Sequence, residues 1–350
     1  MTGGPEMAPR PIVNIGGPRD GPQSPYAWSA PGHLGRSSIS VVLSRLLRES
    51  PDPIPAGDAR EWWRRASERC ADLDAPIDRA IVGGFSGDRV AGAFAAGYQA
   101  ALRALVPSLS GGAIASFCAT ERGGNHPRHI ETRLAPAGAR FTLTGSKRWS
   151  TMGPLASVLL VVATEGIDEA GRNRLRLVMV DATAPGVTIG SMPPTKFVPE
   201  VPHGAIMLQD AALDEAAVLP GDGYARYVRP FRTVEDLHIH GALLGYLISV
   251  ARRHHWAQDV MERVAASVAA TRALALLDPS APEVHVALAG VLAQDARLIS
   301  ELAPSWSRVD AAERERWDRD SALFGSVAGE IRERRRQRAW ESLTPSGGRR

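Results

Sequence analysis

The stretch that decides the fold is CATERGGNHPRHIETRLAPAGARFTLTGSKRWSTMGPLASVLLVVAT, residues 118–164. It alternates short runs of apolar and β-branched residues with segments rich in Gly and Pro, such as APAGA at 135–139. Short runs bounded by turn-forming residues are typical of β-strands. Following the same pattern outward on both sides, we expect strands at 113–120, 140–144, 155–164, 174–181 and 205–208.

No helical pattern separates these strands, which favours a small antiparallel barrel or sandwich at residues 113–215. On its N-terminal side, residues 39–112 have helical periodicity, with loops expected at 50–58 and 81–88. Residues 216–345 return to helical periodicity. The sequence therefore predicts an α+β fold with a helical N-terminal segment, a central antiparallel β-barrel or sandwich domain and a C-terminal helical bundle.

The two ends of the chain differ in composition from the rest. Residues 1–38 hold seven Gly and seven Pro but few apolar residues, so we expect a disordered arm. Residues 330–350 hold seven Arg and three Glu, in a chain of 350 residues whose formal net charge is +3. Because no aromatic platform or zinc-finger spacing accompanies this basic run, we interpret it as a solvated helix end with no nucleic-acid partner.

Cysteine usage and hydropathy give expectations about the compartment. The two cysteines, Cys70 and Cys118, stand far apart and match neither a disulfide framework nor a thiolate metal site. No run of about 18 uncharged apolar residues is present, and the first thirty residues lack the apolar segment of a signal peptide. We therefore expect a cytoplasmic protein with no membrane partner.

Several separated strings resemble the acyl-CoA dehydrogenase family, whose middle domain begins with Cys-x-Thr-Glu-Pro and continues to Asn-Gly-x-Lys-x-Trp-Ile-Thr. This chain has CATER at 118–122 and TGSKRWST at 144–151, in the same order. The resemblance continues through LVMVDATAPGVTIG (177–190), IMLQDAALDEAAVLPGDGYARY (206–227) and GALLG (241–245). It implies an acyl-CoA dehydrogenase-like fold with shortened helical domains and a homo-oligomer formed through the C-terminal bundle.

The resemblance also implies FAD as cofactor, with four binding residues. Thr120 would lie at the pyrimidine side of the flavin, and Trp149 and Thr151 would lie near its ring. Asn125, which follows Gly124 where the family has Gly-Ser-Asp, would donate to the pyrophosphate. The family's Arg-x-x-Phe-Gly, which contacts the cofactor of a neighbouring subunit, is absent from ARRHHWAQDV at 251–260, so we expect weaker FAD binding.

The catalytic base is predicted on the first long helix of the C-terminal part. Most family members carry a Glu in a C-terminal Tyr-Glu-Gly-Thr-x-Glu-like segment, and nothing in residues 300–350 matches it. A minority carry the Glu ten residues before a glycine of the first long helix, and counting back from Gly245 gives Glu235. A desolvated carboxylate there can take the proton α to a thioester. The nearby His238 and His240 face different sides of a helix, so we expect no metal site.

Together these features predict an FAD-dependent oxidoreductase that dehydrogenates an acyl thioester between Cα and Cβ, as acyl-CoA or as a carrier-bound acyl group. The acyl chain and the electron acceptor stay open. Two alternatives also stay open: a catalytically degenerate homologue that acts as a binding or assembly subunit, and a flavin monooxygenase on the same fold.

Overall fold

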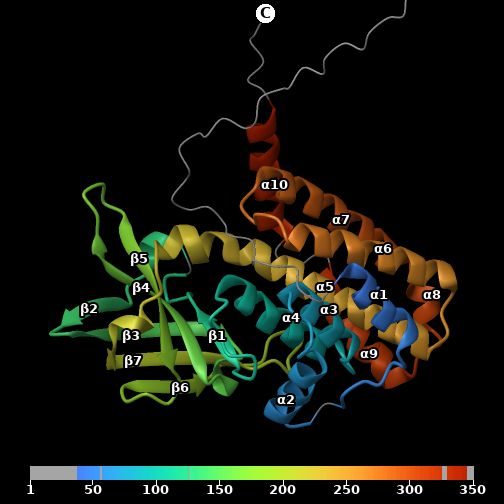
Figure 1. Cartoon of the computed structure of the whole chain (residues 1–350), viewed down its shortest axis with the longest axis horizontal. Coiled ribbons are helices and arrows are strands. Elements are labelled where there is room, and N and C mark those ends of the chain that lie inside the picture. The colour runs from blue at the N-terminus through green and yellow to red at the C-terminus, as the bar shows by residue number, and fades with distance from the viewer. Residues whose placement is uncertain (1–37, 56, 125, 325–328, 345–350) are drawn as a thin grey trace, which may run out of the picture.

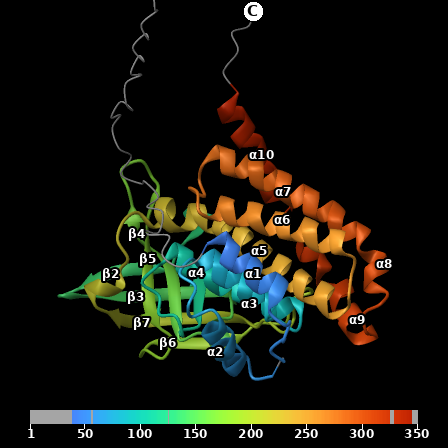
Figure 2. The same ribbon diagram turned by 45° about the vertical axis from the view of Figure 1, so that its right-hand side comes forward.

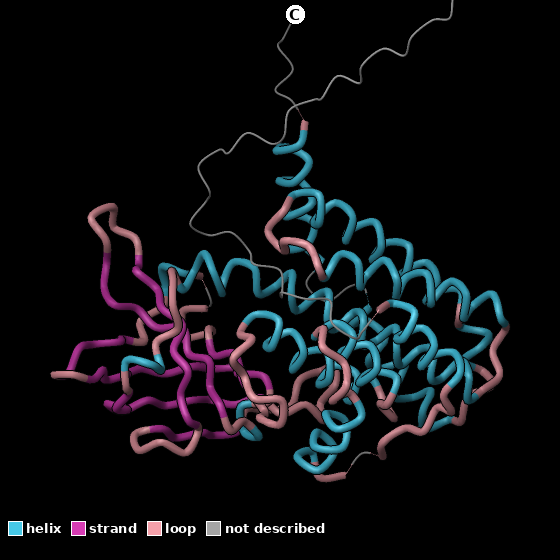
Figure 3. The backbone as a smooth tube through the Cα atoms, viewed as in Figure 1, coloured by secondary structure: helices cyan, strands magenta, loops and turns pink. Residues whose placement is uncertain are grey.

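The computed structural model describes residues 38–55, 57–124, 126–324 and 329–344. Helices come first along the chain: α1 (Ile39–Arg48), α2 (Ala59–Arg69), α3 (Pro76–Phe85) and α4 (Val90–Leu105). Strands follow: β1 (Ala115–Cys118), β2 (Arg133–Ala137), β3 (Arg140–Thr151), β4 (Val158–Ile167), β5 (Asn173–Asp181), β6 (Val187–Ser191) and β7 (His203–Leu213). The C-terminal helices are α5 (Arg229–Arg253), α6 (Gln258–Ala275), α7 (Pro282–Glu301), α8 (Ala303–Trp306), α9 (Ala311–Asp320) and α10 (Gly329–Leu343), with a short 3₁₀ turn η5 (Ser321–Phe324) before α10. Strands and helices occupy separate parts of the molecule (Figure 1, Figure 3).

The described strands form one sheet in the order β1-β4-β2-β3-β7-β6, with β5 also paired to β4. Most pairs are antiparallel, but β1 runs parallel to β4, and so does β2 where Arg133 pairs with Thr164. The predicted α+β architecture is confirmed, with a mixed rather than purely antiparallel sheet. Strands β2 and β6 have no counterpart in the prediction, because each is only five residues long and contains Pro136 or Gly190, which weaken a strand pattern.

The loop predicted at 81–88 is wrong for residues 81–85, which form the end of α3. The glycines that suggested a loop lie where helices cross closely. A Cβ on Gly84 would lie 1.9 Å from the carbonyl oxygen of Ala242, and a Cβ on Gly245 would lie 2.1 Å from that of Ile81. Glycine is needed at both positions because any side chain would force α3 and α5 apart.

Helix α5 connects the parts of the molecule, with α3 and α4 on one side and α6, α7 and α10 stacked beyond it on the other (Figure 1, Figure 2). A buried ion pair of 2.6 Å between Arg272 and Asp78 fastens α6 to α3. The loop between β6 and β7 is held to the end of α9, where the backbone N–H of Val198 donates to Asp320 over 2.8 Å. The sheet, α5 and the C-terminal helices therefore meet around one region, which contains the site described below.

Some expectations concern features that the structure leaves untested. The predicted disordered arm lies outside the described residues, apart from Ser38, whose side chain caps α1. Among the described residues, no helix is long and apolar enough to cross a membrane. The domain boundaries at 39–112, 113–215 and 216–345, the cytoplasmic location and the homo-oligomer stay predictions.

Candidate active site

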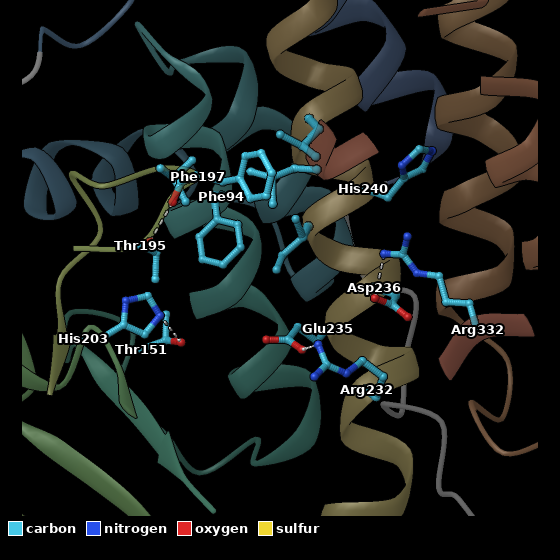
Figure 4. A pocket seen from close by; sticks show the side chains of 14 residues that line it. Phe94, Thr151, Thr195, Phe197, His203, Arg232, Glu235, Asp236, His240 and Arg332 are labelled. Atoms are coloured by element: carbon cyan, nitrogen blue, oxygen red, sulfur yellow. Dashed lines mark hydrogen bonds and ion pairs between the residues drawn. The ribbon is translucent and has the colours of Figure 1, made fainter. Parts of the chain in front are cut away.

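A cavity of about 300 Å³ lies where α5 faces the sheet. Residues from distant segments line it: Phe94 of α4, Thr151 at the end of β3, His203 at the start of β7 and Glu235 of α5 (Figure 4). The loop between β6 and β7, η5 and α10 complete the described walls. The structure thus brings together two of the residues singled out from the sequence, Thr151 and Glu235, although they are 84 positions apart.

Glu235 occupies the α5 wall and is only 8% exposed. Burial raises the pKa of its carboxyl group; Arg232 opposes this shift and the neighbouring Asp236 adds to it. Arg232, one helical turn earlier, donates from Nη1 to Oε2 of Glu235 over 2.8 Å. This is the one hydrogen bond that its carboxylate accepts within the described part of the chain, so the remaining lone pairs are free for a proton. A buried carboxyl with a raised pKa is suited to general-base catalysis near neutral pH.

The wall opposite Glu235 is formed by Thr151 and His203, which pair across β3 and β7. Oγ1 of Thr151 and Nε2 of His203 lie 3.3 Å apart, within hydrogen-bond distance. Burial lowers the pKa of His203, so its ring is neutral at neutral pH. In Figure 4 the Glu235 carboxylate points across the cavity toward this pair. Two uncharged hydrogen-bonding groups therefore face one carboxylate.

Neither Trp149 nor Thr120 lines the cavity. A β-bulge between Lys147 and Ser150 gives β3 one extra residue and places Trp149 in the left-handed region, with φ of 55°. The regular alternation of side chains along β3 is therefore interrupted at Trp149. The Trp149 ring nevertheless lies 6.2 Å from the His203 ring, centroid to centroid, in an edge-on arrangement. The carbonyl oxygen of Thr120 accepts from the backbone N–H of Arg148 over 2.8 Å.

The last predicted cofactor residue, Asn125, lies outside the described residues.

The apolar part of the cavity wall comes mainly from α4, α5 and the β6–β7 loop, through Phe94, Phe197, Ile239 and Leu243. The charged groups gather near Glu235, so the cavity has an apolar part and a polar part.

The C-terminal basic run takes part in this site, contrary to its interpretation as a solvated helix end. Arg332 of α10 lines the cavity and donates to Oδ1 of Asp236 over 2.9 Å. Arg335 donates to Oγ1 of Thr233 over 3.2 Å. These contacts hold α10 against α5, and sequence periodicity gives no sign of them because the two helices lie about 100 residues apart.

The histidines of α5 have partners in the protein. His240 lines the cavity wall, but its Nε2 lies 2.6 Å from Oδ2 of Asp295 on α7. Nδ1 of His238 bonds the carbonyl oxygen of Val234 over 2.7 Å, one turn back along the helix. Over the described ranges, no group of three or more His, Cys, Asp or Glu side chains is placed to hold a metal ion.

Sequence reasoning missed His203, Arg232 and Arg332. Arg232 had a usable signal, because a cation three residues before an acid on one helix lies on the same face. His203 had none, since only the pairing of β7 with β3 brings it next to Thr151.

The sheet region of this chain resembles a known domain family in sequence. Residues 116–211 match the family model described as the acyl-CoA dehydrogenase middle domain. The probable acyl-CoA dehydrogenase YngJ of Bacillus subtilis (strain 168) is 28% identical over 127 residues, which is 35% of this chain and 33% of YngJ. The chain thus matches about a third of the length of that relative.

Solved structures extend the likeness to most of the chain at the level of the fold. The prolyl acyl carrier protein oxidase AnaB superposes with a TM-score of 0.60 at 16% identity, covering 86% of this chain and 97% of AnaB. The structure of PigA with FAD and proline gives 0.59 at 14% identity, covering 86% of this chain and 93% of PigA. The sheet region of this chain thus resembles the acyl-CoA dehydrogenase middle domain in sequence, and the chain as a whole shares the fold of these structures.

Proposed function

We propose that this protein is an FAD-dependent dehydrogenase of acyl thioesters in which Glu235 takes the α-proton. The observation that carries the proposal is the cavity itself. It sets a buried, incompletely hydrogen-bonded carboxylate on α5 opposite Thr151, the residue at which the family resemblance implies a flavin contact. A base and an electron acceptor on opposite sides of one cavity are what removal of a proton from Cα and a hydride from Cβ requires.

The described residues fit FAD on two observations. Trp149 exposes 43% of its surface beside the cavity, next to His203, and a planar ring system stacks favourably on such an indole. The Thr151 hydroxyl and the neutral His203 ring offer hydrogen bonds without a competing charge. Thr151, Trp149, Thr120 and His203 would hold the flavin, and Asn125 is proposed for the pyrophosphate. When bound, FAD supplies a two-electron acceptor for the hydride that leaves Cβ.

The chain's own residues account for the other half of the reaction. The Glu235 carboxylate accepts the proton from Cα as the Cα–H bond breaks, and Arg232 holds one of its oxygens so that the other faces the cavity. Phe94, Ile239 and Leu243 line the apolar part and would hold the acyl chain while excluding water. Water exclusion also favours the raised pKa of Glu235, because it keeps the carboxylate desolvated.

The substrate class follows from the same walls. The apolar lining suits an acyl group, and the similar proteins include a probable acyl-CoA dehydrogenase and a prolyl acyl carrier protein oxidase. We therefore propose an acyl thioester attached either to CoA or to a carrier protein.

The test is the Glu235→Gln variant, which keeps the shape of the side chain but removes the proton acceptor. We expect FAD binding to be retained while the rate of thioester-dependent bleaching of the oxidised flavin falls by about 10²–10⁴-fold. Stopped-flow absorbance with a panel of acyl-CoA and carrier-bound substrates measures both. The matched control is Glu262→Gln on the exposed side of α6, for which the rate should not change.

Two results would contradict the proposal. One is a Glu235→Gln variant that bleaches its flavin as fast as the parent. The other is a parent protein that holds FAD but bleaches with none of the thioesters, which would favour the monooxygenase or the non-catalytic homologue. Oxygen consumption with chemically reduced flavin then separates those two alternatives.

A further inference from the structure

A second hollow, of about 580 Å³, lies between the start of α5 and α10, on the side of the molecule near the α7 N-terminus. Its basic lining consists of Arg229 of α5, His285 of α7, and Arg334, Arg335 and Arg338 of α10. We call this hollow the arginine groove. The described residues that line it include four Arg and one His and no Asp or Glu. A protein surface with this composition carries a local excess of positive charge, although the whole chain is close to neutral.

The arginines of the groove are largely uncompensated by the protein. Within the described ranges, the side chains of Arg229 and Arg338 have no hydrogen bond or ion pair. The side chain of Arg335 bonds the hydroxyl of Thr233 and lies in the field of Asp236 and Glu235. Arg334 has one loose pair with Glu330, 3.9 Å away on the exposed side of α10. By contrast Arg336, two positions before Arg338, is neutralised by Glu333. Unpaired guanidinium groups that converge from two helices are suited to bind an anion.

The positive charge of the groove affects the pKa of His285, which lines it. Burial and the repulsion of Arg335 and Arg229 lower the pKa of His285, while the carboxylates of Asp278 and Asp236 offset only part of the effect. The two arginines are therefore close enough for their fields to overlap at one point. Convergent cations of this kind favour a ligand that carries more than one negative charge in a small volume.

The groove and the cavity that contains Glu235 lie along the same two helices, α5 and α10. Arg229 and Arg335 line the groove, and the cavity is lined by Arg232, one turn later on α5, and by Arg332, one turn earlier on α10. Six residues separate Arg229 from Glu235, which corresponds to about 9 Å along the helix axis. A ligand with a neutral arm at least as long as this distance would span from the groove to the cavity. The anion in the groove and the reacting group in the cavity are thus within reach of one ligand.

A larger hollow extends the groove toward the sheet. It shares Tyr224, Arg229 and Ser280 with the groove and adds Arg128 and Arg174 from the β-domain. The three Asp residues of this extension, Asp168, Asp222 and Asp278, each accept backbone N–H groups of their own turns. These carboxylates are already engaged locally, so they compete little for the arginines.

We propose that the arginine groove binds the phosphate groups of an organic phosphate whose other end lies in the cavity of Glu235. Guanidinium groups bind phosphate oxygens in pairs, and the absence of carboxylates among the described lining residues favours a dianion over a neutral ligand. Two molecules of the proposed reaction carry such phosphates, the phosphopantetheine-type arm of the thioester and FAD. The identification of these candidate ligands rests on the proposed function, but the charge of the groove does not.

The experiment measures how much phosphate contributes to binding. We would titrate the purified full chain with 4′-phosphopantetheine and with pantetheine, and separately with FMN and with riboflavin, by calorimetry or fluorescence. The two members of each pair differ only in one phosphate group. In the double variant Arg229→Gln with Arg338→Gln, we expect the affinity advantage of the phosphorylated member to fall about tenfold or more in one pair. The pair that loses its advantage identifies the source of the phosphate.

Arg336→Gln is the matched control, since it removes the same charge from the same helix at a residue paired with Glu333. The proposal is overturned if both affinity ratios are unchanged in the double variant, or if Arg336→Gln lowers them equally. Both side chains in the double variant are exposed and lack partners among the described residues, so the fold should tolerate their loss. No turnover is needed, and Glu235→Gln should leave the ratios unchanged, so failure here is distinct from failure of the proposed function.

Discussion

Two carboxylates of this protein, Glu121 in the β-domain and Glu235 on α5, are equally buried but differ in their hydrogen bonding. Glu121 is 7% exposed and Glu235 is 8% exposed, and each has a cation beside it. Nevertheless the pKa of Glu121 is lowered and that of Glu235 is raised. Burial alone therefore does not separate a structural carboxylate from one that is available for chemistry.

Glu121 is saturated with donors. It accepts from Nζ of Lys147 over 2.5 Å, from the backbone N–H groups of Glu131 and Thr132, and from the Thr132 hydroxyl over 2.7 Å. Burial would raise its pKa, but the charge of Lys147 and these hydrogen bonds outweigh burial. Among the described residues, Glu235 accepts a hydrogen bond only from Arg232, and a like charge, Asp236, lies beside it. At similar solvent exposure, the number of donors helps to indicate which carboxylate can take a proton.

The largest expected effect on stability comes from breaking the ion pair between Lys147 and Glu121. Lys147→Met removes a cation that is fully buried and leaves Glu121 without its charge partner. Breaking one side of a buried ion pair typically costs about 3–5 kcal/mol of the free energy of unfolding. Urea unfolding of the full chain, followed by circular dichroism, measures the loss.

The chain provides its own control, because Lys196 is its only other lysine. Lys196 is exposed and lies 5.4 Å from the centre of the Phe197 ring, so Lys196→Met should cost below about 1 kcal/mol. Equal losses in the two variants would mean that the Lys147–Glu121 pair is not the structural contact described above.

The second largest expected effect is a difference between two Glu→Gln substitutions in how they change the free energy of unfolding. Glu121→Gln leaves Lys147 facing an amide and should lower the free energy of unfolding by about 1–3 kcal/mol at neutral pH. Glu235→Gln removes a carboxylate whose ionised form is disfavoured by burial, so stability should be unchanged or higher. Parallel denaturant titrations measure both, and a marked loss on Glu235→Gln would remove the contrast between the two sites.

The two carboxylates make the free energy of unfolding of the parent protein depend on pH in opposite directions. Because the folded-state pKa of Glu121 is lowered, its stabilisation is present above the pKa of the unfolded state and is lost as the pH falls through the folded value. Because that of Glu235 is raised, the folded state holds an extra proton between the two pKa values, and stability falls as the pH rises through this window. Each Gln variant should lack the corresponding slope, which unfolding measured at several pH values would detect.

The contrast also explains which parts of the molecule could be predicted from the sequence. Strand runs, helical periodicity and the motif strings depend on local order, and they led to the α+β fold and to Thr151 and Glu235. The structure places these two residues in one cavity, while their roles stay predictions. Lys147 and Glu121 were both inside the quoted strings, but their pairing depends on how the start of the motif folds against β3.

The parts that the sequence did not reveal depend on long-range contacts. His203 reaches the site because β7 pairs with β3, and Arg332 reaches it because α10 packs on α5. Trp149 is displaced by a bulge that the local sequence pattern does not predict. The end of α3 was interpreted as a loop because Gly84 is a frequent loop residue, whereas here it permits a close helix contact. The role of each of these residues depends on a tertiary contact that the local sequence does not specify.

The smallest expected effect concerns Arg232, which donates a hydrogen bond to Glu235. Arg232 lowers the pKa of Glu235 and thereby opposes the rise caused by burial, so Arg232→Gln should move the pKa of Glu235 further upward. The base must be ionised, so the rate of flavin bleaching increases with pH through this pKa, and the variant's profile should shift to higher pH while its plateau changes little. Asp236→Asn should shift the profile the other way, because it removes a like charge and leaves Arg332 without that carboxylate. Profiles of both variants that coincide with the parent would mean that Glu235 is not the group that titrates in the reaction.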